Sequence, residues 1–267
     1  MAHKKLFLLD AYALIYRAHF AFIKNPRINS KGLNTSAVFG FTNSLLDVLN
    51  NESPTHIGIV FDTWAPTFRS DIYEEYKANR DEQPEDIGVA IPYIKKLAEG
   101  FNIPVLELDG YEADDIIATL APKAKKEGFE VYMMTPDKDY SQCVEKDIYI
   151  YKPGRMGKPA EIWDVDKVKE KFDIEDPKQV VDIQGLTGDS VDNIPGVPGI
   201  GPKTASKLIA EFKSLENLLD STEQLKGKQK ERLEEHADDA RLSKELATLK
   251  VDVPIEFEAD KLLKEDP

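Results

Sequence analysis

The chain has 267 residues, 41% of them hydrophobic and 31% charged, which is enough for a core domain with a smaller second domain. It contains no apolar run near the ~20 residues that cross a bilayer and no signal-peptide pattern at its start, so we expect a cytoplasmic protein without membrane contact. The single Cys143 excludes an internal disulfide, the four histidines lack zinc-ligand spacing, and a net charge of −14 argues at first sight against a nucleic-acid partner.

Short apolar runs, separated by stretches long enough for helices, predict an α/β fold with a mainly parallel sheet and flanking helices. The runs cover residues 5–9, 55–61, 103–108 and 130–134. We expect helices at residues 12–22, 36–49, 85–99 and 112–126.

The strands are expected to stop at about Trp163, and the remainder is typical of short helices interrupted by a Pro/Gly-rich segment at 193–202. We place a domain change near residues 164–176. It divides the chain into an α/β domain, residues 1–170, and a helical domain, residues 171–267.

Aspartates follow three of the predicted strands: Asp10 the first, Asp62 the second, and Asp137 with Asp139 the last. Because the carboxyl ends of parallel strands form one crevice, these side chains should gather there. Carboxylates that stand close together raise one another's pKa unless cations accompany them. Hard divalent ions with oxygen ligands are the natural partners, so we predict a metal site at this edge.

Two further acidic motifs join this set. Glu112, Asp114 and Asp115 open a predicted helix, where acids in the first turn are commonly explained by the helix dipole. Asp189 and Asp192 are spaced by three and point the same way on a helical turn, although a solvated Asp-rich turn would look similar. Their joint placement at element ends favours one metal-binding cluster of nine acids.

Such a cluster suits phosphodiester hydrolysis. Two or more Mg²⁺ or Mn²⁺ ions can activate water and stabilise the attacking and leaving oxygens of an in-line displacement at phosphorus. No Ser/His/Asp or Cys/His arrangement stands out, which agrees with direct attack by water. Setting the nine acids aside reduces the net charge from −14 to −5, which weakens the objection to a nucleic-acid partner.

The segment 196–204 contains Gly, Lys and Thr, but Pro202 interrupts the P-loop pattern and no strand precedes it, so we reject a P-loop. Two glycine-rich turns leading into a helix at 203–212 resemble the helix-hairpin-helix class, which grips phosphates through backbone N–H groups. The alternative is that this segment is only a structural turn between helices and does not bind phosphate. Lys203 and Lys207, one helical turn apart, favour phosphate binding.

Two basic runs are typical of solvated faces when each is taken alone. One contains Lys152, Arg155 and Lys158, and the other contains Lys226, Lys228, Lys230 and Arg232.

Over nearly its whole length the chain resembles the flap endonuclease family, in the form of the 5′-nuclease domain of bacterial DNA polymerase I. The residues that carry the resemblance are Leu9-Asp10, Tyr16-Arg17-Ala18, Val60-Phe61-Asp62, Phe68-Arg69, Tyr76-Lys77-Ala78-Asn79-Arg80, Glu112-Ala113-Asp114-Asp115, Thr135-Pro136-Asp137-Lys138-Asp139 and the segment 188–201. The turns after Asp10 and Thr135 depart from the usual family pattern, but no metal ligand is lost.

The resemblance implies a PIN-like sheet and a structure-specific 5′ nuclease, acting as 5′→3′ exonuclease and flap endonuclease in primer removal and excision repair. It implies that Asp10, Asp62, Glu112, Asp114, Asp115, Asp137, Asp139, Asp189 and Asp192 hold the metals, with Asp10 and Asp115 also counted as catalytic. Lys77 and Arg80 would neutralise the scissile phosphate at a helical arch near residues 66–100. From its composition alone, this stretch would be an exposed mixed-charge helix.

The resemblance also implies the partners. DNA would be bound by Arg17, Arg69, Tyr76, Gly199, Gly201, Lys203, Thr204 and Lys207, with K⁺ held by carbonyls of the glycine-rich motif at 193–207. The expected substrates are flaps, nicks and RNA-primed strands. The protein would be monomeric and nucleoid-associated, either a part of a longer polymerase or a stand-alone nuclease.

Two other functions remain open. A PIN-like ribonuclease would share the acidic sheet edge but would give no reason for the motif at 196–207. A non-catalytic module that binds DNA junctions would leave the clustered carboxylates without charge compensation, which destabilises a fold.

Overall fold

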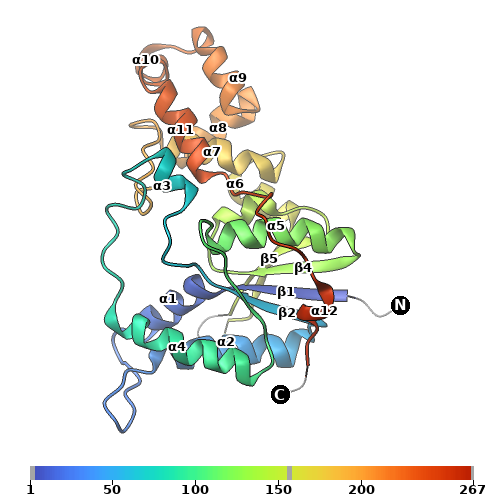
Figure 1. Cartoon of the computed structure of the whole chain (residues 1–267). Helices are drawn as coiled ribbons and strands as arrows, with labels where there is room; N and C mark the ends of the chain where they lie inside the picture. Colours follow the sequence, from blue (N-terminus) through green and yellow to red (C-terminus); the bar gives the residue numbers. More distant parts are fainter. Residues whose placement is uncertain (1–3, 155–157, 266–267) are drawn as a thin grey trace.

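The computed structural model describes residues 4–154 and 158–265, which form a sheet with helices on both faces and a helical region beyond one side of it (Figure 1). The sheet has six strands in the order β3-β2-β1-β4-β5-β6. They are β1 (Lys4–Asp10), β2 (His56–Val60), β3 (Val105–Leu106), β4 (Phe129–Met134), β5 (Ile148–Lys152) and β6 (Glu161–Trp163). All neighbours pair in parallel except β5 and β6, which confirms the predicted α/β class.

The central strand β1 fixes the position of the acidic edge. Its last residue, Asp10, pairs with Val60 of β2, and Leu9 pairs with Met134 of β4. Asp62 and Asp137 follow these neighbouring strands within a few residues. The register therefore brings the predicted carboxylates to one edge of the sheet.

The helices that cover the sheet agree with the predicted ones to within a few residues. One face carries α1 (Ala11–Ala21), α2 (Ser36–Asp47) and α4 (Glu85–Gly100), and the other carries α5 (Ala113–Lys126). A π-helical turn, Val48–Glu52, follows α2. Each helix buries an apolar stripe against a strand face, as Ile116, Leu120 and Ala124 of α5 illustrate.

The strand predictions failed in two places. The sheet gains β5 and β6, which the sequence reasoning did not predict. The run 103–108 forms only the two-residue β3, in part because Pro104 has no N–H to donate to a neighbouring strand.

The second half of the chain is helical, as predicted. It contains α6 (Val165–Phe172), α7 (Val180–Thr187), α8 (Pro202–Phe212), α9 (Leu215–Asp220), α10 (Gly227–Glu235), α11 (Ala237–Ala247) and α12 (Ala259–Leu262), with 3₁₀ turns at Pro177–Gln179 and Thr222–Gln224. One apolar cluster runs from α5 and β4 into α7, α8 and α9, so the two halves share a core. The domain boundary near 164–176 stays a prediction.

After α11 the chain returns across α5 to the sheet, where α12 packs on β2 (Figure 1). Lys264 donates its backbone N–H to the carbonyl of Thr55 at 2.9 Å, which ties the end of this segment to the start of β2. Within the described ranges, no helix is both long and apolar enough to span a membrane.

Candidate active site

Three hydrogen-bond donors hold the buried carboxylate of Asp10 at the edge of the sheet. One carboxylate oxygen accepts from the backbone N–H of Ala13 at 3.1 Å and so caps α1. The other oxygen accepts from the hydroxyls of Thr135 at 3.1 Å and Tyr140 at 3.0 Å. Burial, and then the charge of Asp62, raise the pKa of Asp10 to about 7. The ionised form of Asp10 is therefore unfavourable at this site unless a cation lies beside it.

Tyr140 was missed by sequence reasoning. It lies in the 3₁₀ turn Asp139–Cys143 and is almost fully buried. The only signal in the sequence was its position next to Asp139, and that position does not predict a contact with a residue 130 positions away.

Asp62 and Asp139 resemble Asp10, because each is a carboxylate whose pKa is raised by burial. Asp62 accepts the backbone N–H of Ala113 at 3.0 Å, and burial raises its pKa. Burial, followed by the charge of Asp137, raises the pKa of Asp139 to about 7. One oxygen of Asp139 is buried without a hydrogen-bond partner. Such an oxygen is available to a cation, and carboxylates are the ligands that hard divalent ions prefer.

Asp114 belongs with these carboxylates. Burial, and then the charge of Glu112, raise the pKa of Asp114 well above its usual range. One of its oxygens accepts the backbone N–H of Asp115 at 2.7 Å. No basic side chain forms a close ion pair with Asp114 among the residues that the structure describes.

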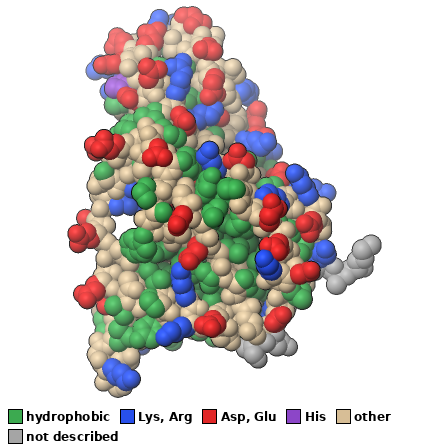
Figure 2. Space-filling view, in the orientation of Figure 1, with side chains coloured by type: hydrophobic (Ala, Val, Ile, Leu, Met, Phe, Trp, Pro, Cys, Tyr) green, Lys and Arg blue, Asp and Glu red, His purple; other side chains and the backbone are tan. Residues whose placement is uncertain are grey.

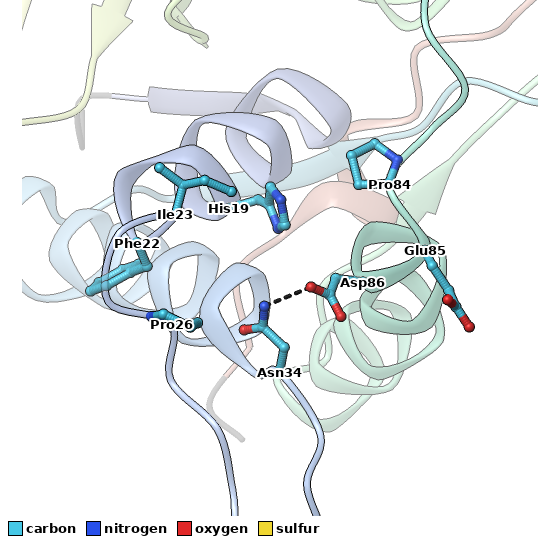
Figure 3. Close-up of a pocket in the computed structure, with 8 residues that line it drawn as sticks. All are labelled: His19, Phe22, Ile23, Pro26, Asn34, Pro84, Glu85 and Asp86. Carbon is cyan, nitrogen blue, oxygen red and sulfur yellow. Dashed lines mark hydrogen bonds between the residues drawn. The ribbon is translucent and has the colours of Figure 1, made fainter.

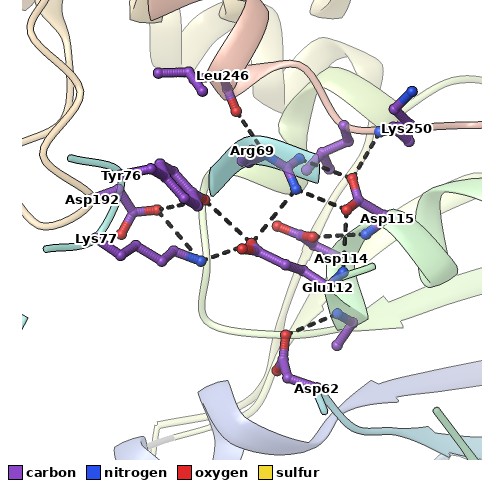
Figure 4. Close-up of polar contacts among 12 residues, drawn as sticks. Asp62, Arg69, Tyr76, Lys77, Glu112, Asp114, Asp115, Asp192, Leu246 and Lys250 are labelled. Atoms are coloured by element: carbon purple, nitrogen blue, oxygen red, sulfur yellow. Dashed lines mark hydrogen bonds and ion pairs between the residues drawn. The ribbon is translucent and has the colours of Figure 1, made fainter. Parts of the chain in front are cut away.

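Glu112 contacts cations directly (Figure 4). It precedes α5 and forms a capping box with Asp115. Its Oε2 accepts from Lys77 Nζ at 2.7 Å and from the Tyr76 hydroxyl at 3.3 Å, and it lies 3.7 Å from a guanidinium nitrogen of Arg69. Burial alone would raise the pKa of Glu112, but the neighbouring cations, Lys77 foremost, outweigh it and the pKa is lowered.

Lys77 lies in a tight turn rather than in the exposed helix that composition suggested. Its φ of 58° is left-handed, which costs energy for a residue with a side chain. Its backbone N–H donates to the Asp192 carbonyl at 2.9 Å. Only α3 (Phe68–Ile72) is helical before α4 in this stretch, and Tyr76 is buried. The irregular path arises because contacts with distant residues override the local preference.

Arg80 follows in the same segment. One of its guanidinium nitrogens lies 2.5 Å from a carboxylate oxygen of Asp192, while about half of its side chain remains exposed. Lys77 Nζ lies 3.9 Å from the other oxygen of Asp192. The structure thus brings the two predicted phosphate-neutralising residues to the acidic edge.

Asp115 and Arg69 form a buried pair. Two parallel hydrogen bonds of 2.8 Å join the guanidinium to the carboxylate, and neither side chain is more than 1% exposed. Asp115 also accepts the backbone N–H groups of Lys250 and Glu112, at 2.8 and 3.2 Å. Arg69 donates further to the carbonyl of Leu246 at 2.9 Å. Arg69 is therefore not exposed for the DNA contact that we predicted, and the oxygens of Asp115 are fully engaged.

The nine carboxylates do not form one ready cluster. In the described part of the chain, no three His, Cys, Asp or Glu side chains are arranged to hold a metal ion. The charges of Asp189 and Asp192 nevertheless contribute to the raised pKa of Asp139, so the two acidic motifs lie near each other. The metal-ligand assignments stay predictions.

The glycine-rich segment connects α7 to α8, as expected. Gly199 has a φ of 78°, and a Cβ there would collide with the guanidinium of Arg232 on α10, which donates to the Gly199 carbonyl at 3.4 Å. Gly201 caps α8, Lys203 and Lys207 are exposed, and Thr204 is half-buried. The basic run that contains Arg232 did not predict this contact with Gly199.

Arg17 is anchored beside the end of β5. Its guanidinium donates to the carbonyls of Pro153 and Gly154 at 2.8 and 2.5 Å. Lys152 lies 3.7 Å from the ring centroid of Trp163. Arg155, which the sequence analysis grouped with Lys152, lies outside the described residues.

A shallow pocket lies elsewhere, between the ends of α1 and α4 (Figure 3). Asn34 donates to Asp86 there at 2.7 Å. The pocket is lined by His19, Phe22, Ile23, Pro26, Asn34, Pro84, Glu85 and Asp86. None of these residues was predicted for the site, and the pocket lacks the gathered carboxylates.

The surface shows how the charge of −14 is distributed. In Figure 2, acidic and basic side chains are interspersed over the visible face, without a large patch of either sign. The net negative charge is therefore not concentrated in one acidic patch on this face.

Comparison with known proteins gives consistent matches over both halves of the chain. Residues 5–173 match the family described as "5'-3' exonuclease, N-terminal resolvase-like domain", and residues 175–267 match "5'-3' exonuclease, C-terminal SAM fold". A solved structure described as "Divalent metal ions (zinc) bound to T5 5'-exonuclease" is similar with a TM-score of 0.74 and 21% identity, over 92% of this chain and 90% of that one.

Among curated relatives, DNA polymerase I of Bacillus subtilis (strain 168) is 45% identical over 95% of this chain, but the match spans only 28% of that protein. A 5'-3' exonuclease of Aquifex aeolicus (strain VF5) is 38% identical over 97% of this chain and 86% of its own length. The family matches, together with the carboxylates and cations at the sheet edge, lead to one conclusion: the chain belongs to the 5′-3′ exonuclease family.

Proposed function

We propose that this chain is a divalent-metal-dependent 5′ nuclease that hydrolyses DNA phosphodiester bonds, both as a 5′→3′ exonuclease and as a flap endonuclease. The observation that carries the proposal is that buried carboxylates without close basic partners lie at the same edge of the sheet as Lys77 and Arg80. Family membership supports the same chemistry.

The donor set fits Mg²⁺ or Mn²⁺. The residues that would hold the ions are Asp10, Asp62, Glu112, Asp114, Asp137, Asp139, Asp189 and Asp192. All offer carboxylate oxygens, and one oxygen of Asp139 is buried without a partner in the described part of the chain. When bound, the ions would supply an activated water and charge stabilisation at phosphorus. We assign Asp115 a positioning role instead, because Arg69 and backbone groups already engage both of its oxygens.

Lys77 and Arg80 would act on the scissile phosphate. Both side chains now pair with acids, Lys77 with Glu112 and Arg80 with Asp192. These carboxylates would bind metal ions in the active enzyme, which frees the two basic side chains for phosphate oxygens. A cation that meets charge as it develops in the transition state lowers the barrier.

The glycine-rich segment 193–207 would grip duplex DNA through backbone N–H groups and through Lys203 and Lys207. A K⁺ ion held by loop carbonyls belongs to the same proposal. Arg17 and Tyr76 contact the protein itself, so a DNA contact by either needs a rearrangement on binding.

Cleavage of an end-labelled 5′-flap duplex with Mg²⁺, with Mn²⁺ and with EDTA tests the proposal. We expect short 5′ products with either metal and none with EDTA. Intact DNA in all three conditions would contradict it. The same flap made of RNA on the duplex separates this function from a ribonuclease, since a ribonuclease would cut only the RNA.

A further inference from the structure

The turn that carries Lys77 is joined to the loop at residues 188–196 by two asparagine side chains. Asn79 donates to the Ser190 carbonyl at 2.7 Å, and Asn193 donates to the Glu75 carbonyl at 2.7 Å. The donors come from opposite partners, so each segment holds the backbone of the other. We call this pair of hydrogen bonds the interlock. Neither asparagine side chain is assigned to metal, phosphate or duplex binding above: Asn193 begins the glycine-rich segment, but the proposed duplex contacts there are backbone N–H groups, Lys203 and Lys207.

The two hydrogen bonds of the interlock lie on either side of Lys77 in the sequence. The Lys77 backbone, between Glu75 and Asn79, adopts left-handed geometry and donates to the Asp192 carbonyl at 2.9 Å. Left-handed backbone at a residue with a side chain persists when its surroundings hold it. The two asparagine bonds lie on either side of Lys77 and, together with the Arg80–Asp192 ion pair, hold this turn against the loop.

The loop on the other side of the interlock is stiff. Asp189 and Ile194 exchange two backbone hydrogen bonds, at 3.0 and 2.8 Å, which close the loop on itself. Gly188 and Gly196 pack so tightly that a Cβ on Gly196 would lie 2.3 Å from the Gly188 nitrogen. The Gly196 N–H donates to the Ser243 hydroxyl of α11 at 2.8 Å. A displacement of this loop would therefore move it as one unit.

An apolar contact reinforces the connection. Tyr76, Ile194, Leu246 and Ala247 form a small buried cluster of their own. The residue before Lys77 and the residue after Asn193 thus pack together, which keeps the two segments at a fixed separation.

The same loop runs directly into the glycine-rich segment proposed to grip the duplex. We propose that the interlock transmits duplex binding at residues 196–207 to Lys77, with Asn79 and Asn193 as positioning residues that aim Lys77 at the scissile phosphate. Resting on the proposed function, this inference adds a physical reason why cleavage would require a duplex next to the 5′ strand. The nuclease would then be fast only when both sites are occupied by one DNA molecule.

The test removes each hydrogen bond without disturbing the fold. Asn79→Ala changes an exposed side chain. Asn193→Gly keeps the left-handed backbone, since Asn193 has a φ of 57° and glycine adopts that region freely. Matched controls are Asn51→Ala, which removes an exposed 2.7 Å side-chain bond to Asp47, and Asn102→Gly, at another left-handed asparagine.

Single-turnover cleavage rates at saturating enzyme are measured on a 5′ flap attached to a duplex and on the same strand without its complement. For each variant we expect about a threefold to tenfold lower rate on the duplex substrate, as for one lost hydrogen bond. The rate on the free strand and the affinity for the duplex should change less than twofold. The controls should match the wild type on both substrates.

A double-mutant cycle identifies the residue through which the interlock acts. If it acts through Lys77, Asn79→Ala should have no further effect in a Lys77→Ala background. Multiplicative effects would overturn the proposal, and so would equal rate losses on both substrates or a loss of duplex affinity alone. A wild-type protein that cuts neither substrate would instead refute the nuclease function itself, so the two failures are distinguishable.

Discussion

The acidic edge consists of two halves with opposite electrostatics. Glu112, Asp115 and Asp192 pair with Lys77, Arg69 and Arg80, and the pKa of Glu112 is lowered as a result. Asp10, Asp62, Asp114 and Asp139 have no close basic partner in the part of the chain that the structure describes, and burial raises the pKa of each.

This difference assigns roles within a set of acids that look alike in the sequence. A buried carboxylate with a raised pKa gains most from a divalent ion, since the ion replaces the missing charge compensation. A carboxylate already saturated by arginine gains little. We therefore expect the unpaired half to contribute most to metal affinity and Asp115 to be structural, whereas Glu112 and Asp192 would bind metal only when they release Lys77 and Arg80.

The largest effect should come from Asp139→Asn on the unpaired half. Loss of one metal-binding oxygen should lower flap cleavage by about a thousandfold or more, because the metal supplies several kcal/mol of transition-state stabilisation. Binding to flap DNA in Ca²⁺, measured by electrophoretic shift, should be nearly intact. Asp260→Asn, an exposed acid on α12, is the control. Cleavage at the wild-type rate would remove Asp139 from the metal site.

Asp115→Ala on the paired half should act mainly on stability. It would leave the Arg69 guanidinium buried without its partner, which costs about 3–5 kcal/mol. Urea unfolding in EDTA measures this cost, and the affinity for Mn²⁺ by calorimetry should be close to that of the wild type under conditions where both are folded. Unchanged stability with lost Mn²⁺ binding would return Asp115 to the metal ligands.

Lys77→Ala separates transition-state stabilisation from simple binding. The single-turnover rate should fall by roughly a hundredfold, as for one preorganised electrostatic donor, while affinity changes far less. Lys167→Ala, at an exposed ion pair on α6, provides the comparison. If the rate at saturating enzyme does not change, Lys77 is a solvated lysine with no part in cleavage.

The smallest effect is expected at the duplex grip. Lys203→Ala should weaken duplex binding by a few-fold at every sequence and reduce the salt slope by about one unit, as for a single phosphate contact. Lys261→Ala on α12, far from α8 in Figure 1, should leave the slope unchanged. A loss limited to particular base sequences would indicate base readout instead.

The sequence predicted well what depends on local order and on strand direction. The positions of Asp10, Asp62, Asp137 and Asp139 followed from parallel strands, whose ends meet by construction. The helices that cover the sheet followed from apolar periodicity.

Contacts that depend on distant chain segments were not predictable. Arg69 was expected to contact DNA at the surface. Its side chain is instead buried, and it donates to the carbonyl of Leu246, 177 residues away. The turn at Lys77 is held by Asp192, and no local preference indicates left-handed backbone there. The motif Glu112 to Asp115 likewise gave no sign that its last acid would face an arginine.

Thermal unfolding of the protein at different pH values tests whether the unpaired carboxylates require a divalent metal ion. The pKa of Asp10 is about 7 in the folded protein against 3.8 ordinarily, so the unfolded state loses its proton first. The metal-free protein in EDTA should lose stability as the pH rises from about 4 to 7, and the loss should be smaller in Asp139→Asn. Mg²⁺ should raise the unfolding temperature more at pH 8 than at pH 5. Equal stabilisation by Mg²⁺ at both pH values, with the same pH slope in the variant, would show that the unpaired carboxylates do not require the metal.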